Sequence, residues 1–340
     1  MPASQSDTPY LDALRDFAQR GPARLHVPGH KGGAGADSRL MEAIGERALA
    51  LDIPALMWGI DVGVEPTPFA ESQRLAAEAW GARRTWFMVN GASQGNHVAL
   101  MTLAHSGSRV VLQRNAHSST IDALVLSGLL PTFAAPELDP DLHVAHCLRP
   151  ETLDAALSET PDAVGAAVVS PTYFGAVADV AALAEVAHGH GVPLVVDEAW
   201  GAHLAFSDEL PAAALSQGAD LVISSTHKIV GSLTQSAMVH LGHGDRIDED
   251  VVDSTSVTQR STTPSSIRSP CPRWIIADWV RLPTTLWMLE ITRSAPRLSA
   301  GAGSSSWKPR WAPQASSTTS GTPCACATSV SPATSATAPK

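Results

Sequence analysis

At 340 residues the chain is long enough for about two domains, and with 44% hydrophobic and 16% charged residues it can bury a core. A formal net charge of −10 argues against a general binder of nucleic acid or of anionic membranes. No apolar run approaches the ~20 residues that span a bilayer, and the amino terminus lacks the basic and apolar regions of a secretion signal, so the sequence predicts a soluble, cytoplasmic protein.

The four cysteines argue against two further classes of site. Cys147 stands alone, whereas Cys271, Cys324 and Cys326 fall near the carboxyl end. This spacing is not a disulfide framework, and the Cys-x-Cys pair has neither a second pair nor histidine partners for zinc. We therefore expect no metal site.

Residues 1–255 have the pattern of an α/β domain. Valine-rich apolar runs bounded by Pro, Gly or Asp are typical of strands, and apolar residues at helical spacing are typical of helices. This alternation of strand, helix and strand along the chain predicts parallel βαβ units. Strands are expected at residues 85–89, 109–112, 163–170 and 192–196, and helices at residues 98–103 and 180–188.

A glycine-rich turn, Val89-Asn-Gly-Ala-Ser-Gln-Gly-Asn-His, joins the first of these strands to a helix. Backbone N–H groups at a helix amino terminus hold phosphate, and Ser93 and Gln94 add side-chain donors. Because glycine-rich turns of this kind are common, the motif alone also fits an ordinary strand-to-helix connection.

Two polar side chains follow predicted strands further along the chain. His117 comes after the strand at 109–112, and Asp197 ends the apolar run Val192-Pro-Leu-Val-Val-Asp. Alone, His117 fits a surface or structural histidine, and Asp197 fits a helix or turn cap. A carboxylate at the end of a buried strand can instead keep a pyridine nitrogen protonated, because a nearby opposite charge favours the cationic form.

Lys228 lies in Ser224-Ser-Thr-His-Lys-Ile-Val-Gly-Ser-Leu-Thr-Gln-Ser-Ala-Met, directly after the apolar run at 220–223. An amine at the mouth of a strand, flanked by hydroxyl groups able to hold a phosphate, is what a pyridoxal phosphate (PLP) enzyme needs to form its Schiff base. A solvated loop that contains one lysine is the alternative. Because Asp197 and Lys228 follow strands of a parallel sheet, we expect both at the edge where α/β folds bind ligands.

Two neighbours of Lys228 are further candidates for the same site. His227 is able to donate to a phosphate or a carboxylate, or to transfer a proton near neutral pH. Ser225 is a candidate phosphate donor.

The character of the chain changes after residue 255. Residues 256–340 are crowded with Ser, Thr and Pro, hold five of the nine tryptophans, and carry nine Lys or Arg against two Asp or Glu. Three interpretations compete for this tail, namely a disordered linker, a basic binding tail and a reading-frame shift near residues 259–261. We favour the frameshift, because a GC-rich gene read out of frame yields such a mixture.

The segment around Lys228 resembles the lysine-attachment motif of the ornithine/lysine/arginine decarboxylases, a branch of the PLP-dependent fold-type I enzymes (aspartate aminotransferase superfamily). Separated motifs in the same order extend the resemblance over about residues 8–255. It implies a three-layer α/β/α PLP-binding major domain with a mostly parallel central sheet at residues 1–255. An irregular or disordered tail at 256–340 then replaces the end of that domain and a small carboxyl-terminal domain.

The resemblance also implies roles for individual residues. Ala92, Ser93 and Gln94 match contacts to the PLP phosphate, His117 matches a residue that stacks on the ring, and Ala199 is small enough to admit the other ring face. The implied catalytic residues are Lys228, Asp197, His227 and His117. The implied cofactor-binding residues are Ala92, Ser93, Gln94, His117, Asp197, Ala199, Ser225, His227 and Lys228.

Three positions depart from the family pattern. Ile223 stands where a smaller residue is usual, Trp200 where many relatives carry His, and Ser118 where Lys is frequent. We therefore assign no catalytic role to Trp200 and no cofactor contact to Ser118.

The function that the resemblance implies is PLP-dependent decarboxylation of ornithine, lysine or arginine to the amine, through a Lys228 Schiff base and in a homodimer or larger homo-oligomer. Another fold-type I reaction, that of an aminotransferase or an aldolase, is the alternative enzyme. A further alternative is that the altered tail leaves the polypeptide inactive.

Overall fold

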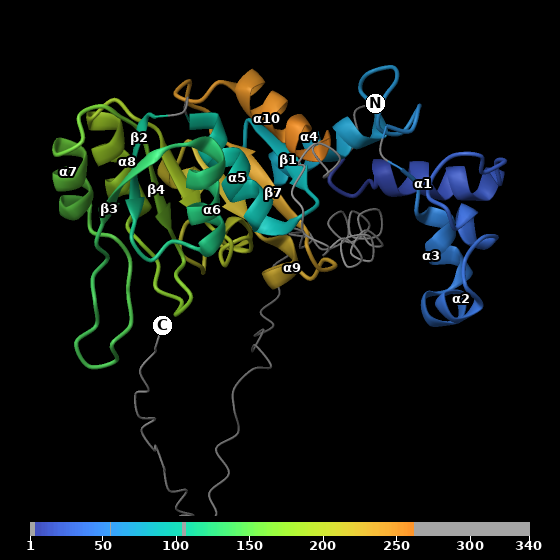
Figure 1. Ribbon diagram of the computed structural model, residues 1–340, viewed down its shortest axis with the longest axis horizontal. Coiled ribbons are helices and arrows are strands. Elements are labelled where there is room, and N and C mark those ends of the chain that lie inside the picture. The colour runs from blue at the N-terminus through green and yellow to red at the C-terminus, as the bar shows by residue number, and fades with distance from the viewer. Residues whose placement is uncertain (1–3, 55, 104–106, 262–340) are drawn as a thin grey trace, which may run out of the picture. The chain divides into compact units, whose positions relative to one another are not determined.

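The computed structural model describes residues 4–54, 56–103 and 107–261 (Figure 1). Its centre is a seven-stranded sheet in the order β1-β7-β6-β5-β4-β2-β3. Only β7 runs against its two neighbours, whereas the other pairings are parallel, so the expectation of a mostly parallel sheet is confirmed. The strands are β1 (Arg84–Met88), β2 (Arg109–Gln113), β3 (Leu130–Ala134), β4 (Ala163–Val169), β5 (Leu194–Asp197), β6 (Leu221–Ser224) and β7 (Ala237–Leu241).

Both helices that the sequence pattern predicts are observed, one of them with a different start. The predicted helix at 180–188 is observed within one residue, whereas the helix expected at 98–103 begins seven residues earlier, because the glycine-rich turn itself forms its first turns. The α-helices are α1 (Pro9–Arg20), α2 (Ser38–Ile44), α3 (Glu46–Leu51), α4 (Pro68–Trp80), α5 (Gly91–Leu103), α6 (Ser118–Ser127), α7 (Pro150–Ser158), α8 (Val180–Gly189), α9 (Thr226–Ile229) and α10 (Glu249–Ser261).

The predicted three layers follow from the alternation of side chains along the strands. Trp86 and Met88 of β1 point to the face covered by α5, α6 and α10, whereas Phe87 between them points to the opposite face. On that opposite face α7 and α8 cover the central strands (Figure 1). None of the helices in the described residues combines the length and the hydrophobicity that a bilayer crossing requires.

The amino-terminal segment packs onto the same sheet. Tyr10, Leu14 and Phe17 of α1 form one apolar cluster with Phe87 of β1 and Met238 of β7. The burial of these side chains ties the first helix to the strands that flank the candidate site.

Helix α10 is tied to β1 by charge. The guanidinium group of Arg84 contacts Glu249 at 2.7 Å and Asp253 at 2.8 Å, and the indole N–H of Trp86 donates to Asp253 at 2.9 Å. The helix runs through residue 255, where the sequence pattern changes, and ends at Ser261. The tail beyond Ser261, including most of the segment for which we favour a frameshift, lies outside the described residues.

Helix α5 approaches the sheet closely at one glycine. A Cβ atom added at Gly95 would lie 2.6 Å from Cγ2 of Ile223 and 3.3 Å from Cγ2 of Val239. The larger residue at 223, which departs from the family pattern, therefore occupies space that Gly95 leaves open. This close contact sets how near the first turns of α5 lie to β6 and β7.

We predict that Gly95→Ala destabilises the fold by about 1–3 kcal/mol, because the added methyl group overpacks against Ile223. A second substitution, Ile223→Ala, removes the opposing methyl and should cost less in the Gly95→Ala background than in the wild type. A double-mutant cycle of denaturant unfolding measures this coupling. Gly189→Ala in α8, which meets no atom within 4 Å, is the matched control and should be neutral or slightly stabilising. Equal effects of Gly95→Ala and Gly189→Ala would contradict the close-contact argument.

Candidate functional site

The candidate site lies where β4, β5 and β6 end. Asp197 is the last residue of β5, and its Cα pairs with Val169 at the end of β4 and with Ile223 near the end of β6. Lys228 follows from the short helix α9, directly after β6. The topology thus brings the predicted carboxylate and amine to one sheet edge, as expected for parallel strands that end together.

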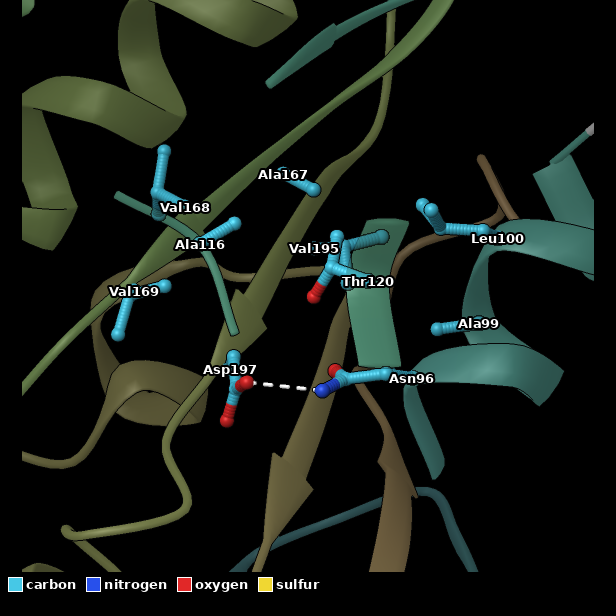
Figure 2. A pocket seen from close by; sticks show the side chains of 10 residues that line it. All are labelled: Asn96, Ala99, Leu100, Ala116, Thr120, Ala167, Val168, Val169, Val195 and Asp197. Atoms are coloured by element: carbon cyan, nitrogen blue, oxygen red, sulfur yellow. Dashed lines mark hydrogen bonds between the residues drawn. The ribbon is translucent and has the colours of Figure 1, made fainter. Parts of the chain in front are cut away.

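Asp197 is a buried carboxylate with two hydrogen-bond donors. Its side chain is 7% exposed, its Oδ2 atom accepts from Nδ2 of Asn96 at 2.9 Å, and its Oδ1 atom accepts from the backbone N–H of Ala199 at 3.1 Å. Burial raises the pKa of Asp197 above its ordinary value, while the two donors and the charge of Lys228 act to lower it. Figure 2 shows the Asn96 contact beside a small pocket between α5 and the strand ends.

Lys228 is half-buried beneath an indole ring. Its Nζ atom lies 4.5 Å from the centre of the Trp200 ring. Burial lowers the pKa of the Lys228 amine, and the charge of Asp197 opposes that shift. The amine is therefore held near the carboxylate in surroundings that favour its uncharged, nucleophilic form more than water does.

His117 lies at the amino terminus of α6 and belongs to a row of three aromatic rings, His117, Tyr173 and Trp200, which we call the aromatic wall. Its ring stacks against Tyr173 with centroids 6.4 Å apart, and Tyr173 meets Trp200 edge-on at 6.1 Å. The ring nitrogen Nδ1 of His117 accepts from the backbone N–H of Ser119 at 3.2 Å and thereby caps the helix. The wall therefore connects the predicted stacking residue to the ring above Lys228.

The glycine-rich turn keeps free donors at the start of α5. The backbone N–H groups of Ala92 and Ser93 have no partner among the described residues. The Oε1 atom of Gln94 accepts from the backbone N–H groups of both Val89 and Asn90 at 3.0 Å, so this side chain shapes the turn and keeps only its amide NH2 group for a ligand.

The turn and the lysine segment are held together by backbone. The N–H group of Gly91 donates to the carbonyl of Gln235 at 2.7 Å. Both residues have positive φ values, +70° at Gly91 and +71° at Gln235, and a side chain at 91 would be strained. The two motifs that the sequence associates with a phosphate therefore lie side by side.

His227 and Ser225 lie in a hydroxyl-rich segment next to Lys228. The Nδ1 atom of His227 donates to the carbonyl of Ser236 at 3.1 Å and lies 3.3 Å from Oγ of Ser225. The hydroxyl of Thr226 donates to Ser236, whose hydroxyl donates to the carbonyl of Leu233. These bonds fix the loop on either side of the lysine.

Asn96 and Ser119 contribute hydrogen bonds at the candidate site although the sequence pattern assigns them no role. Asn96 follows Ser93 by three residues, and this spacing puts both on one side of α5. The helical spacing was the available signal for Asn96, but its partners come from β5 and α6 and are invisible in the local pattern.

Glu198, the neighbour of Asp197, belongs to the other side of the strand end. Its side chain is 3% exposed and its Oε1 atom accepts from the backbone N–H of Ala214 at 2.8 Å. Burial raises the pKa of Glu198 to about 8. Adjacent carboxyl groups thus lie in different surroundings, because Asp197 lies near the Lys228 amine whereas burial favours the uncharged form of Glu198.

The donor set of the site fits pyridoxal phosphate. A buried carboxylate can face the ring nitrogen, a nearby amine can take the aldehyde, and the free N–H groups of α5 can face the phosphate. The buried indole N–H of Trp200, whose ring lies against Nζ of Lys228, also lacks a partner among the described residues. In contrast, the described residues contain no group of three His, Cys, Asp or Glu side chains that could hold a metal ion.

Comparisons with known proteins agree with this geometry. Residues 8–267 match the model of the family described as Orn/Lys/Arg decarboxylase, major domain. The arginine decarboxylase of Bacillus subtilis is 40% identical over 263 residues, covering 77% of this chain and 53% of the relative, and that of Halalkalibacterium halodurans is 39% identical, covering 71% and 49%. The chain thus spans about half the length of the curated relatives that it matches.

Solved structures show the same fold. The constitutive lysine decarboxylase of Escherichia coli superposes with a TM-score of 0.64 at 19% identity, over 85% of this chain and 40% of that one. Lysine decarboxylase A from Pseudomonas aeruginosa superposes with a TM-score of 0.62 at 23% identity, over 83% and 40%. The fold-type I architecture expected from the sequence is confirmed.

We predict that Glu198→Gln removes a pH-dependent loss of stability. Because the pKa of Glu198 is raised from 4.5 to about 8 on folding, wild-type stability is fully present below pH 4.5 and declines as the pH rises toward 8. The limiting slope is about 1.4 kcal/mol per pH unit. Denaturant unfolding between pH 5 and pH 8 should show that the free energy of unfolding of the variant, relative to that of the wild type, increases with each pH unit. Glu185→Gln, on the exposed side of α8, is the matched control, and parallel curves for wild type and Glu198→Gln would rule the explanation out.

Proposed function

Since the chain belongs to the Orn/Lys/Arg decarboxylase family, we propose that its site holds pyridoxal phosphate on Lys228 and decarboxylates a basic amino acid to the corresponding amine. The observation that supports this most directly is the buried carboxylate of Asp197 beside a half-buried amine with a lowered pKa. Few structural needs explain two opposite charges withdrawn from water at the open edge of a sheet, and catalysis is a common one.

Different residues would hold different parts of the cofactor. Asp197 would face the ring nitrogen, His117 one ring face and Ala199 the other, with Lys228 bound to the aldehyde carbon. The phosphate would be held by Ala92, Ser93, the amide NH2 group of Gln94, and Ser225 with His227. When bound, PLP supplies an electron sink for the pair of electrons left when carbon dioxide departs.

The chain's own groups would do the remaining chemistry. Asp197, ionised and oriented by its two donors, would keep the ring nitrogen protonated. Lys228 would accept or return a proton at Nζ, which its lowered pKa favours near neutral pH. His227, whose Nδ1 hydrogen is bound to a carbonyl, would present Nε2 for proton transfer. Tyr173 and Trp200 would exclude water from the reacting bond.

Arginine is the favoured substrate within the basic class. The relatives of 39–40% identity that cover at least 71% of this chain are arginine decarboxylases, whereas a lysine decarboxylase of Pseudomonas aeruginosa is 25% identical. We further propose a homodimer or larger homo-oligomer, as the family resemblance implies, and a cytoplasmic location, as expected from the sequence.

Lys228→Ala should abolish covalent capture of PLP. Reduction of the full-length chain with borohydride after PLP is added, followed by peptide mapping, should place the label on Lys228 in the wild type. Lys228→Arg keeps the positive charge but forms no imine, so it should also lose the label. A label on Lys31, or none on the wild type, would refute the proposal.

Asp197→Asn should lower kcat for amine release by about 100-fold or more, because an amide cannot hold the ring nitrogen protonated. The label on Lys228 should persist in this variant, which separates electronic loss from loss of the cofactor. Assays with arginine, lysine and ornithine that quantify amine, carbon dioxide and keto acid check the reaction class. Keto acid as the main product would favour an aminotransferase instead.

A further inference from the structure

Resting on the proposed cofactor, we propose that Asn96 is a positioning residue that holds Asp197 and, through Ser119, His117 in one hydrogen-bonded chain. Its side-chain amide nitrogen donates to Oδ2 of Asp197 at 2.9 Å and to the hydroxyl of Ser119 at 2.9 Å. The Ser119 hydroxyl lies 2.7 Å from Nδ1 of His117. One amide therefore joins the residue expected at the ring nitrogen to the residue expected on the ring face.

In each of these hydrogen bonds, the chemistry of the two atoms decides which one donates and which one accepts. A carboxylate oxygen only accepts, so the amide group of Asn96 must present its nitrogen, not its oxygen, to Asp197. The second hydrogen of that nitrogen then goes to Ser119, whose oxygen accepts it. The Ser119 hydroxyl hydrogen is left to donate to Nδ1 of His117.

The same assignment of donors and acceptors determines the tautomer of His117. Its Nδ1 atom also accepts from the backbone N–H of Ser119 at 3.2 Å, and a backbone N–H group can only donate. Nδ1 therefore carries no hydrogen, and the ring hydrogen lies on Nε2. Asn96 acts in the same direction through Ser119, because a hydroxyl oxygen that accepts from Asn96 keeps its own hydrogen for Nδ1 of His117.

The chain is also well shielded from water. Asn96, Ser119 and Asp197 are 5%, 3% and 7% exposed, so water cannot readily replace a lost donor. A buried hydrogen bond to a charged group is worth more than one in water, and its loss leaves the carboxylate with the N–H of Ala199 as its remaining hydrogen-bond donor. The other titratable groups acting on or affected by Asp197 are Lys228 from α9, His117 at the start of α6, and Tyr173 after β4.

The test measures the PLP dissociation constants of Asn96→Ala, Asn96→Asp and the wild type between pH 6 and pH 8.5. The quantity compared is the dissociation constant of each variant divided by that of the wild type. For Asn96→Ala we expect a ratio of about ten or more, because a bond to a charged group is lost. The ratio should grow as the pH falls, since Asp197 without its donor takes up a proton at higher pH than in the wild type. For Asn96→Asp the ratio should shrink as the pH falls, because a proton shared by the two carboxyl groups restores a donor.

Controls separate positioning from general damage. Thr102→Val removes a polar group from the same helix, where the hydroxyl donates to the carbonyl of Val98, and should leave affinity and pH dependence unchanged. Ser119→Ala should leave the pH dependence of affinity as in the wild type, because the Asn96–Asp197 bond remains. Ser127→Ala, at the other end of α6, is its matched control.

A measurement without cofactor tests the chain independently. Nitrogen-15 NMR of the histidine rings, with His117 assigned by His117→Gln, should show Nδ1 without hydrogen in the wild type. In Asn96→Ala and Ser119→Ala the population with hydrogen on Nδ1 should rise above that of the wild type, because the oriented hydroxyl donor is lost and only the backbone N–H of Ser119 still opposes that tautomer. Wild-type protein that binds no PLP would overturn the proposed function, and the NMR result would still decide the hydrogen-bonded chain. PLP affinity and pH dependence of Asn96→Ala equal to those of Thr102→Val would overturn this inference alone.

Discussion

The site depends on one electrostatic constraint, which is that the Asp197 carboxylate is taken out of water at the end of β5. Burial raises the pKa of this carboxyl group, and the features that oppose the shift include the amide of Asn96, the N–H of Ala199 and the positive charge of Lys228. Burial acts in the opposite direction on Lys228, whose pKa it lowers because it favours the uncharged amine. The charge of each group opposes the shift that burial causes in the pKa of the other, so removing one group changes the pKa of its partner.

Backbone placement makes this pairing possible. Parallel strands β5 and β6 end at the same edge, and α5 lies close to β6 because Gly95 has no side chain to meet Ile223. The close approach brings Asn96 within hydrogen-bond distance of Asp197, while the bond from Gly91 to Gln235 anchors the start of α5 to the lysine segment. Packing and chemistry are thus coupled through a single helix.

Adjacent residues show how strongly environment decides chemistry. Asp197 and Glu198 are neighbours in sequence and both are buried, yet Asp197 has the donors and the nearby amine, whereas Glu198 has one backbone donor and a pKa of about 8. His240 gives a third example, since it lies between the hydroxyls of Thr85 and Ser224 deep in the sheet, and burial lowers its pKa to about 3. Only the first of these groups faces the sheet edge where a ligand would bind.

The sequence by itself determined the alternation of strands and helices, the family, and the motifs that hold Lys228, Asp197 and the glycine-rich turn, because these are local patterns of residue type and spacing. It did not reveal Asn96, since its role depends on partners 23 and 101 residues away in the chain. Nor did it show that Gln94 shapes its own turn, or that Gly95 makes room for Ile223. Tertiary structure decided these points, because burial, distance and hydrogen-bond direction exist only once the strands and helices have packed.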